Sequence, residues 1–252
     1  VRNMERIEVD PIILSKGWTK IALYGIGHIK DERLNYASEN GYLHFKRPVK
    51  DNGEPDESYF NILVIHQNRF KGSMLGVSRR HSITDDFFPE FIHLVIWGHE
   101  HEWIPEAKEV AQTGVHILQP GSSVATSLIK AEAEQKNTFQ LQVYKKAFKL
   151  VPTPLQNIRP IIYKQLELKT TGIDPRRMDM VERYIEKYAS DILKENSFRH
   201  KPKEFRIPLL RIKIEYTDYQ VIRSKKLADN MMSKIANPND FMQFYKKKQF
   251  EK

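Results

Sequence analysis

The chain has 252 residues, enough for one large domain or two ordinary ones, and no apolar run approaches the roughly 18 residues of a membrane span. It contains no cysteine, which excludes a disulfide framework and a zinc site built on thiolates. Its net charge is +9, and the excess lies in residues 151–252, where 22 Lys+Arg face 13 Asp+Glu, against 19 of each in residues 1–150. This asymmetry favours a polyanionic partner such as nucleic acid, with a merely solubilising surface as the alternative.

Short apolar runs bounded by glycine or polar residues predict buried strands in the first 150 residues. They lie at residues 20–25, 61–65, 94–97 and 115–118. Residues 138–144 alternate instead, with Phe139, Leu141 and Val143 on one side, which is typical of a half-exposed strand. This part of the sequence therefore reads as an α/β domain rich in strands.

A domain boundary is expected at residues 151–154, where two prolines coincide with the change in charge balance. Residues 162–168 then alternate as a strand. Asp174 and Pro175 predict the cap and first position of a helix. Apolar residues continue that helix at spacings of three or four: Met178, Val181, Ile185, Tyr188 and Ile192.

The last fifty residues complete a small α+β unit. Residues 196–208 read as a basic connector, and residues 210–215 alternate as another strand. Two short helices are expected at the end, at residues 227–235 and 239–248.

Nine histidines are present, and three of them stand at the ends of predicted strands. His66 closes one apolar run, and His99 and His101 directly follow another. The other six are scattered, and we interpret them as surface or packed residues: His28, His44, His81, His93, His116 and His200.

The spacing of His99 and His101 suits a metal site. Side chains two apart in an extended segment point the same way, so both rings can face one point with Glu100 turned away. Gly98 allows a sharp turn there, and His66 would join them because functional groups collect where strands of an α/β sheet end. Imidazoles suit borderline transition metals. The alternative is a set of loop and packing histidines without a metal.

A longer motif around these histidines resembles a known family. Ile96-Trp97-Gly98-His99-Glu100-His101-Glu102 is similar to the last metal motif of calcineurin-like metallophosphoesterases. It is most like the version in the double-strand-break repair nucleases of the MRN/MRX complex, the meiotic recombination 11 family of eukaryotic type. Further stretches match that family in order: residues 20–25, 31–34, 64–69, 119–128 and 236–238, with Phe244.

The resemblance implies an α/β fold with two domains. Residues 1–154 would be the C-terminal half of a calcineurin-like β-sandwich flanked by helices, and residues 155–252 a small α+β capping domain that binds DNA. It also implies a manganese-dependent endonuclease and 3′–5′ exonuclease of double-strand break repair. His66, His99 and His101 match three ligands of its two Mn²⁺ ions.

The sequence departs from the family at the other ligands. Those belong to Asp-x-His, Gly-Asp and Gly-Asn-His-Asp motifs, the last of which supplies the histidine that protonates the leaving group, and none of them occurs here. We expect that they lie upstream of Val1. We also expect that this chain alone binds metal weakly and cleaves little, because three imidazoles cannot hold two octahedral ions.

Basic residues beyond residue 154 form three clusters that would neutralise DNA phosphates, although a solvated surface explains any single one equally well. They are Arg199, Lys201, Lys203 and Arg206; then Arg223, Lys225 and Lys226; then residues 246–248. The resemblance further implies a homodimer, an SMC-like ABC-type ATPase, a nibrin-type regulatory subunit and a nuclear location.

Two other functions stay open. One is a different metallophosphoesterase acting on phosphomonoesters, which would share the Gly-His-x-His end but not the later basic domain. The other is a non-catalytic DNA-binding and assembly module, which the missing ligand motifs favour.

Overall fold

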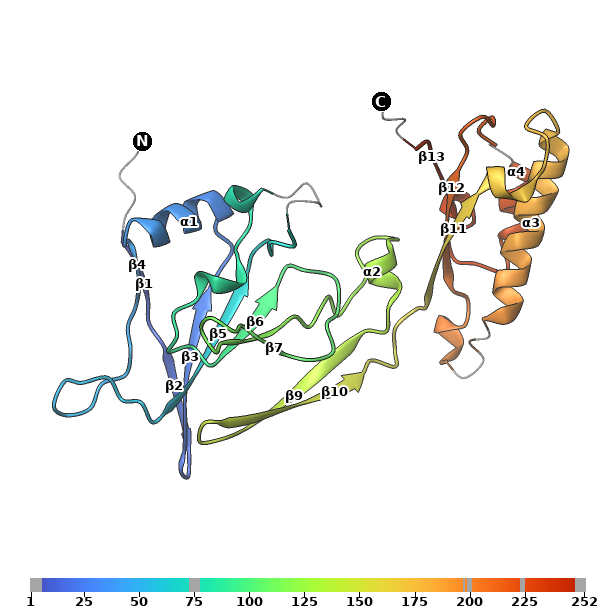
Figure 1. The fold of residues 1–252 in the computed structure, drawn as a ribbon. Coiled ribbons are helices and arrows are strands. Elements are labelled where there is room, and N and C mark those ends of the chain that lie inside the picture. The colour runs from blue at the N-terminus through green and yellow to red at the C-terminus, as the bar shows by residue number, and fades with distance from the viewer. Residues whose placement is uncertain (1–5, 73–77, 197, 199–200, 223–224, 248–252) are drawn as a thin grey trace. The chain divides into compact units, whose positions relative to one another are not determined.

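The structure, a computed structural model, forms two compact units (Figure 1). It describes residues 6–72, 78–196, 198, 201–222 and 225–247. Unit 1 comprises Val1–Ser123 and Lys136–Pro154, and unit 2 comprises Val124–Gln135 and Leu155–Lys252. Within the described ranges, no helix has the length and apolar character needed to cross a membrane.

A six-stranded mixed sheet forms the centre of unit 1, in the order β2-β3-β5-β6-β8-β7. Its strands are β2 (Ile12–Lys16), β3 (Thr19–Ile26), β5 (Tyr59–His66), β6 (Leu94–Gly98), β8 (His116–Leu118) and β7 (Lys108–Glu109). The four inner strands are parallel, and the two edge strands are antiparallel to their neighbours. The inner strands are the four predicted apolar runs, so that prediction is confirmed.

The two faces of this sheet are covered by different elements (Figure 1). On one face, α1 (Asp31–Glu39) and the paired strands β1 (Ile7–Val9) and β4 (Leu43–Phe45) close a core that includes Leu63 and Trp97. The 3₁₀ helices Arg79–His81 and Asp85–Phe87 lie in the loop between β5 and β6. The mixed α/β class predicted from the sequence is confirmed.

An antiparallel hairpin of β9 (Asn137–Tyr144) and β10 (Ala147–Pro154) covers the other face. Phe139, Leu141 and Val143 pack there, as the alternating pattern predicts. The prolines at residues 151–154 do not form an irregular linker, because they are the end of β10. Proline is tolerated in an outer strand whose N–H groups point away from its partner.

Unit 2 contains the parallel sheet β11-β12-β13 and the long helix α3. The strands are β11 (Ile161–Glu167), β12 (Leu209–Glu215) and β13 (Met242–Tyr245), and the helices are α2 (Lys130–Ala133), α3 (Met178–Glu195) and α4 (Lys225–Met231). Short 3₁₀ helices occupy Leu168–Thr171, Lys203–Phe205 and Pro238–Asp240. Val181, Ile185 and Ile192 of α3 are buried in the same cluster as the sheet residues Leu210 and Ile212.

The start of α3 differs from the prediction. The Asp174 side chain accepts a hydrogen bond from the Arg176 N–H, and its carbonyl accepts one from Arg177. These bonds close a separate turn, so the helix begins at Met178 with Arg177 as its N-cap. A favourable capping residue therefore served a turn instead of the helix.

The C-terminal end of unit 2 is also different. The helix expected at residues 239–248 is wrong, because Met242–Tyr245 forms strand β13 beside β12. A short segment of four residues forms a strand here because the free edge of the buried strand β12 is available for pairing. The helix expected at residues 227–235 is α4, which ends at Met231 and continues in turns as far as Ile235.

Candidate functional site

Two neighbouring strands of unit 1 end side by side at the candidate metal site. His66 ends β5 and Gly98 ends β6, and these two residues are partners in the parallel register. A Cβ atom on Gly98 would lie 2.9 Å from the Ile65 carbonyl oxygen and 3.0 Å from Nδ1 of His66. Glycine therefore allows the close approach that places the ring of His66 beside the end of β6.

His99 turns away from the strand direction. Its φ is +76°, in the left-handed region, so the expectation of an extended segment from His99 to His101 is wrong. The turn brings Nδ1 of His99 to 3.3 Å from Nε2 of His66, and Nε2 of His99 to 2.9 Å from Oδ1 of Asn68. Two of the three predicted histidines thus come together, by a different backbone route.

The carboxylate of Glu100 contacts the segment that follows β5. It accepts the Arg69 backbone N–H at 2.8 Å and lies 2.7 Å from Nζ of Lys71. These contacts tie the segment after β6 to the segment after β5. The expectation that Glu100 is turned away from the histidines stays a prediction.

His101 lies near the pair, and its main chain is fixed. Its carbonyl accepts a hydrogen bond from Ser122 at 3.4 Å, and a Cβ on Gly121 would lie 3.0 Å from the same oxygen. The described residues include no group of three or more His, Asp or Glu placed to hold a metal ion. The role of His101 as a third ligand therefore stays a prediction.

The His66–His99 pair fits one side of a metal site. Two nitrogens bound at about 2.1 Å to the same cation lie roughly 3.0–3.4 Å apart in octahedral or tetrahedral geometry. The observed separation of 3.3 Å falls in that range. The pKa of His99 is lowered, first because burial penalises the charged ring and then because His66 lies beside it. Lowered basicity leaves a lone pair available for a metal at neutral pH.

Arg69 is a part of this region that sequence reasoning missed. Its guanidinium is buried, forms a bidentate ion pair with Asp85 at 2.8 and 2.7 Å, and donates to Oε1 of Gln119 at 2.9 Å. It also lies over the ring of Trp97. No local sequence pattern predicts these partners, because they are 16 to 50 residues away in the chain.

The other histidines are mostly remote from the pair. His93 is held by the Asn61 backbone N–H and lies at the opposite end of the sheet, as does His116. His28 is nearer than expected, since its ring centroid lies 6.4 Å from that of His66. His200 lies outside the described residues.

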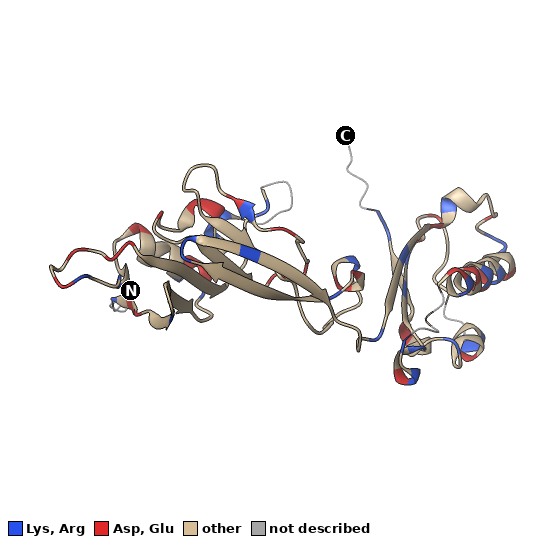
Figure 2. Ribbon diagram, turned by 90° about the horizontal axis from the view of Figure 1, so that it is seen from below, with Lys and Arg blue, Asp and Glu red and all other residues tan. Residues whose placement is uncertain are grey.

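The predicted basic clusters lie on unit 2, where Figure 2 marks Lys and Arg. Arg199, Arg223 and Lys248 lie outside the described residues. Lys203, Lys225 and Lys226 are exposed, whereas Lys201 is half-buried with its ammonium donating to the Gln156 carbonyl. Lys247 forms an ion pair with Glu167, and Lys246 lies over the ring of Tyr216.

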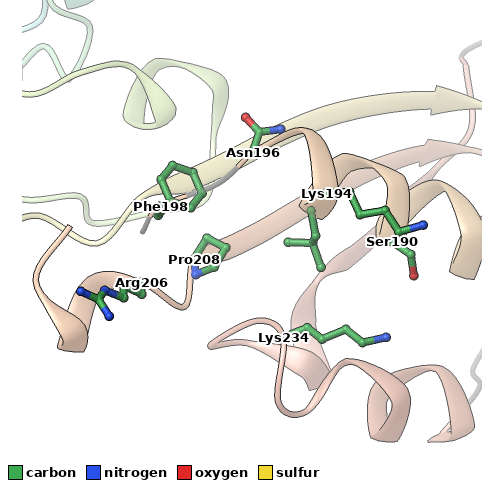
Figure 3. Close-up of a pocket in the computed structure, with 8 residues that line it drawn as sticks. Ser190, Lys194, Asn196, Phe198, Arg206, Pro208 and Lys234 are labelled. Atoms are coloured by element: carbon green, nitrogen blue, oxygen red, sulfur yellow. The ribbon is translucent and has the colours of Figure 1, made fainter. Parts of the chain in front are cut away.

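Arg206 belongs to a pocket of about 690 Å³ at the C-terminal end of α3 (Figure 3). Among the described residues, three cations, three apolar residues and two polar ones line it, and no acidic residue does: Lys194, Arg206, Lys234, Leu193, Phe198, Pro208, Ser190 and Asn196. The sequence did not predict Lys194 and Lys234 as members, because they are 40 positions apart. The combination suits a ligand with both anionic and flat apolar parts.

Comparisons with known proteins show that the chain is similar in sequence to DNA repair proteins. Residues 148–252 match the family described as "Mre11 DNA-binding presumed domain". The protein "Double-strand break repair protein MRE11" of Oryza sativa subsp. japonica is 36% identical over 244 residues, 95% of the chain and 34% of that relative. "Double-strand break repair protein mre-11" of Caenorhabditis elegans is 35% identical over 266 residues (97% and 36%), and "Double-strand break repair protein MRE11" of Homo sapiens 31% over 258 (97% and 34%). The chain spans about a third of the length of these curated relatives.

Proposed function

Because the chain belongs to the Mre11 family of double-strand break repair proteins, we propose that it is part of a metal-dependent DNA nuclease of double-strand break repair. The observation that carries the proposal is the pair of imidazoles, His66 and His99, 3.3 Å apart at the ends of neighbouring parallel strands. We further propose the calcineurin-like metallophosphoesterase fold for unit 1.

The proposed metal ligands are His66, His99 and His101, and the proposed ions are two Mn²⁺ in the complete site. Such ions would polarise the phosphodiester and lower the pKa of a bound water. Two residues of this chain position the proposed ligands. Gly98 leaves room for the ring of His66, and Asn68 forms a hydrogen bond with His99.

DNA contact is proposed for unit 2, whose residues 155–252 contain the whole basic excess of the chain. Helix α3 has five acidic and three basic residues, so the excess lies on the strands and connecting segments. The pocket of Lys194, Arg206 and Lys234 adds Phe198, on which a base could stack. Phosphate neutralisation by these cations would make binding strongly salt-dependent.

We also propose that the protein assembles with other proteins. It would act in the nucleus, where broken chromosomal ends lie. The proposed partners are a second copy, an SMC-like ABC-type ATPase and a nibrin-type subunit. An apolar surface on the first hairpin of unit 1 supports assembly, since Ile12, Leu14 and Trp18 are 63%, 50% and 85% exposed. Exposed apolar patches of this kind commonly mark interaction sites.

The test is Mn²⁺-dependent cleavage of labelled single-stranded DNA by the complete protein. His66→Gln and His99→Gln should each lower the rate at least about tenfold, because each removes a metal ligand. His116→Gln is the matched control, since His116 begins β8 at the opposite end of the same sheet. It should leave the rate unchanged.

Three results would contradict this assignment in different ways. Equal activity of the His66→Gln and wild-type proteins would remove these histidines from the site. Salt-sensitive DNA binding without any Mn²⁺-dependent cleavage would favour a non-catalytic DNA-binding and assembly module. Preferential hydrolysis of small phosphomonoesters would point to another class of metallophosphoesterase.

A further inference from the structure

A carboxylate and an amide lie behind the His66–His99 pair and were not identified as site residues from the sequence. Asp31, the first residue of α1, is only 7% exposed. Its Oδ2 accepts a hydrogen bond of 2.6 Å from Nδ2 of Asn68. Oδ1 of the same Asn68 lies 2.9 Å from Nε2 of His99. The three side chains therefore form a continuous chain from α1 to the candidate metal ligand.

The chemistry of this chain fixes the direction of every hydrogen bond. A carboxylate only accepts, so the NH₂ group of Asn68 must face Asp31 and its carbonyl oxygen must face His99. A carbonyl oxygen in turn accepts only from a protonated ring nitrogen, so Nε2 of His99 carries the hydrogen. Nδ1 is then the unprotonated atom, and it is the nitrogen 3.3 Å from His66.

Two features indicate that this arrangement is kept at a cost to the fold. Oδ1 of Asp31 is buried without a hydrogen-bond partner among the described residues. An unsatisfied buried oxygen destabilises the folded state. His99 has a left-handed backbone conformation at φ +76°, which is strained for a non-glycine residue. Local costs of this kind concentrate at functional sites.

We propose that Asp31 and Asn68 are positioning residues that hold His99 in its Nε2–H tautomer, so that the Nδ1 lone pair is directed to the metal side of the site. Asp31 lies in the first turn of α1, where the helix dipole favours a negative charge. The carboxylate fixes the amide, and the amide fixes the ring. The link to a metal rests on the proposed function, whereas the tautomer does not.

Nitrogen-15 NMR of the histidine rings in the metal-free chain tests the tautomer at pH 8, above the ordinary pKa of an imidazole. Wild type should show His99 with hydrogen on Nε2. Asn68→Leu should lose this preference because leucine accepts no hydrogen bond. Asn68→Asp should weaken it, because repulsion between the carboxylates at positions 31 and 68 would move the acceptor away from Nε2 of His99. The double variant Asp31→Asn/Asn68→Asp reverses the amide–carboxylate pair and should restore the tautomer.

Mn²⁺ titration of the complete protein, as wild type and with the same three sets of changes, tests the metal part of the proposal separately from the tautomer. The single variants should bind Mn²⁺ about tenfold to a hundredfold more weakly than wild type, and the double variant should recover. An unchanged His99 tautomer in folded Asn68→Leu would overturn the positioning role. A changed tautomer with identical Mn²⁺ affinity would support positioning and contradict the metal site of the proposed function.

Discussion

The polar residues of the candidate metal site in unit 1 and those of the α3 pocket in unit 2 are held in opposite ways. In unit 1, His99, Asn68 and Arg69 each have two or more side-chain or main-chain partners, several of them buried. In unit 2, the cations of the α3 pocket stand at the surface: Lys194 contacts Asp191 at 3.4 Å, and Arg206 donates to one carbonyl. No hydrogen bond or ion pair of the Lys234 side chain is found within the described residues.

This difference matches two kinds of task. A metal site needs ligands fixed within a fraction of an ångström, so its supporting bonds must be interlocked. A phosphate backbone is met by charge at several points, and flexible cations suffice. Loss of one group should therefore be costly at the site in unit 1 and nearly neutral in the α3 pocket of unit 2, where only combined changes should matter.

The largest expected effect is on stability in unit 1. Arg69→Leu should lower the free energy of unfolding by about 3 kcal/mol, because it leaves Asp85 and Gln119 without their buried partner. Urea denaturation should show a lower midpoint with an unchanged slope. The control is Arg33→Leu on the exposed side of α1, which should cost less than about 0.5 kcal/mol. Equal losses in the two variants would remove the contrast between interlocked and surface groups.

A smaller effect is expected on DNA affinity in unit 2. The triple variant Lys194→Glu/Arg206→Glu/Lys234→Glu should bind single-stranded DNA on the order of tenfold more weakly at low salt. The slope of log K against log salt should become less steep, while each single variant changes affinity by less than about threefold. Fluorescence anisotropy across a salt series measures both quantities, and thermal unfolding verifies that the fold is kept.

A triple charge reversal on unit 1 is the matched control for this measurement. Lys16, Lys108 and Lys149 are exposed lysines of β2, β7 and β10. Their replacement by Glu changes the net charge by the same amount. If both triple variants lose the same affinity, overall charge governs binding and the α3 pocket has no special role.

A third effect, similar in free energy to the change in DNA affinity, concerns His93, whose pKa is lowered to about 4 by burial and by the nearby charge of Lys146. The unfolded chain takes up a proton near pH 6.5 while the folded chain resists it, so this histidine's contribution is complete above pH 6.5 and is lost as the pH falls towards 4. After solvent screening, the loss should be about 1–2 kcal/mol.

His93→Asn keeps an acceptor for the Asn61 N–H and removes the titration. Its unfolding free energy should therefore fall less steeply between pH 7 and pH 4.5 than that of wild type. Urea denaturation at a series of pH values measures the two slopes. If the unfolding free energies of His93→Asn and wild type fall with pH at the same slope, the environment of His93 does not hold its ring in the neutral form.

The inner strands of unit 1 were predictable from the sequence, because a strand that is buried on both faces has a continuous run of apolar residues. The runs that became β3, β5, β6 and β8 are short and apolar, so the position of His66 at a strand end followed directly. Strand β13 has no such run. Its four residues became a strand because the edge of β12 was open, and no local pattern records that edge.

The candidate site was predictable only in its main members. His66 and His99 were found from their place after apolar runs, yet the backbone turn at His99 was not, since the rule for extended segments ignores φ. Asp31 and Arg69 were missed because their partners are distant in sequence: Asn68 follows Asp31 by 37 positions. Complementary hydrogen bonding over such distances exists only once the chain is folded.

The prolines at the end of β10 have a consequence for the solubility of unit 1. Pro152 and Pro154 are two residues apart, so the donors that they lack belong to the same side of the strand. An added strand would find carbonyl oxygens there without the N–H groups that a ladder needs. The two prolines therefore disfavour pairing of this end of β10 with the strand of another molecule.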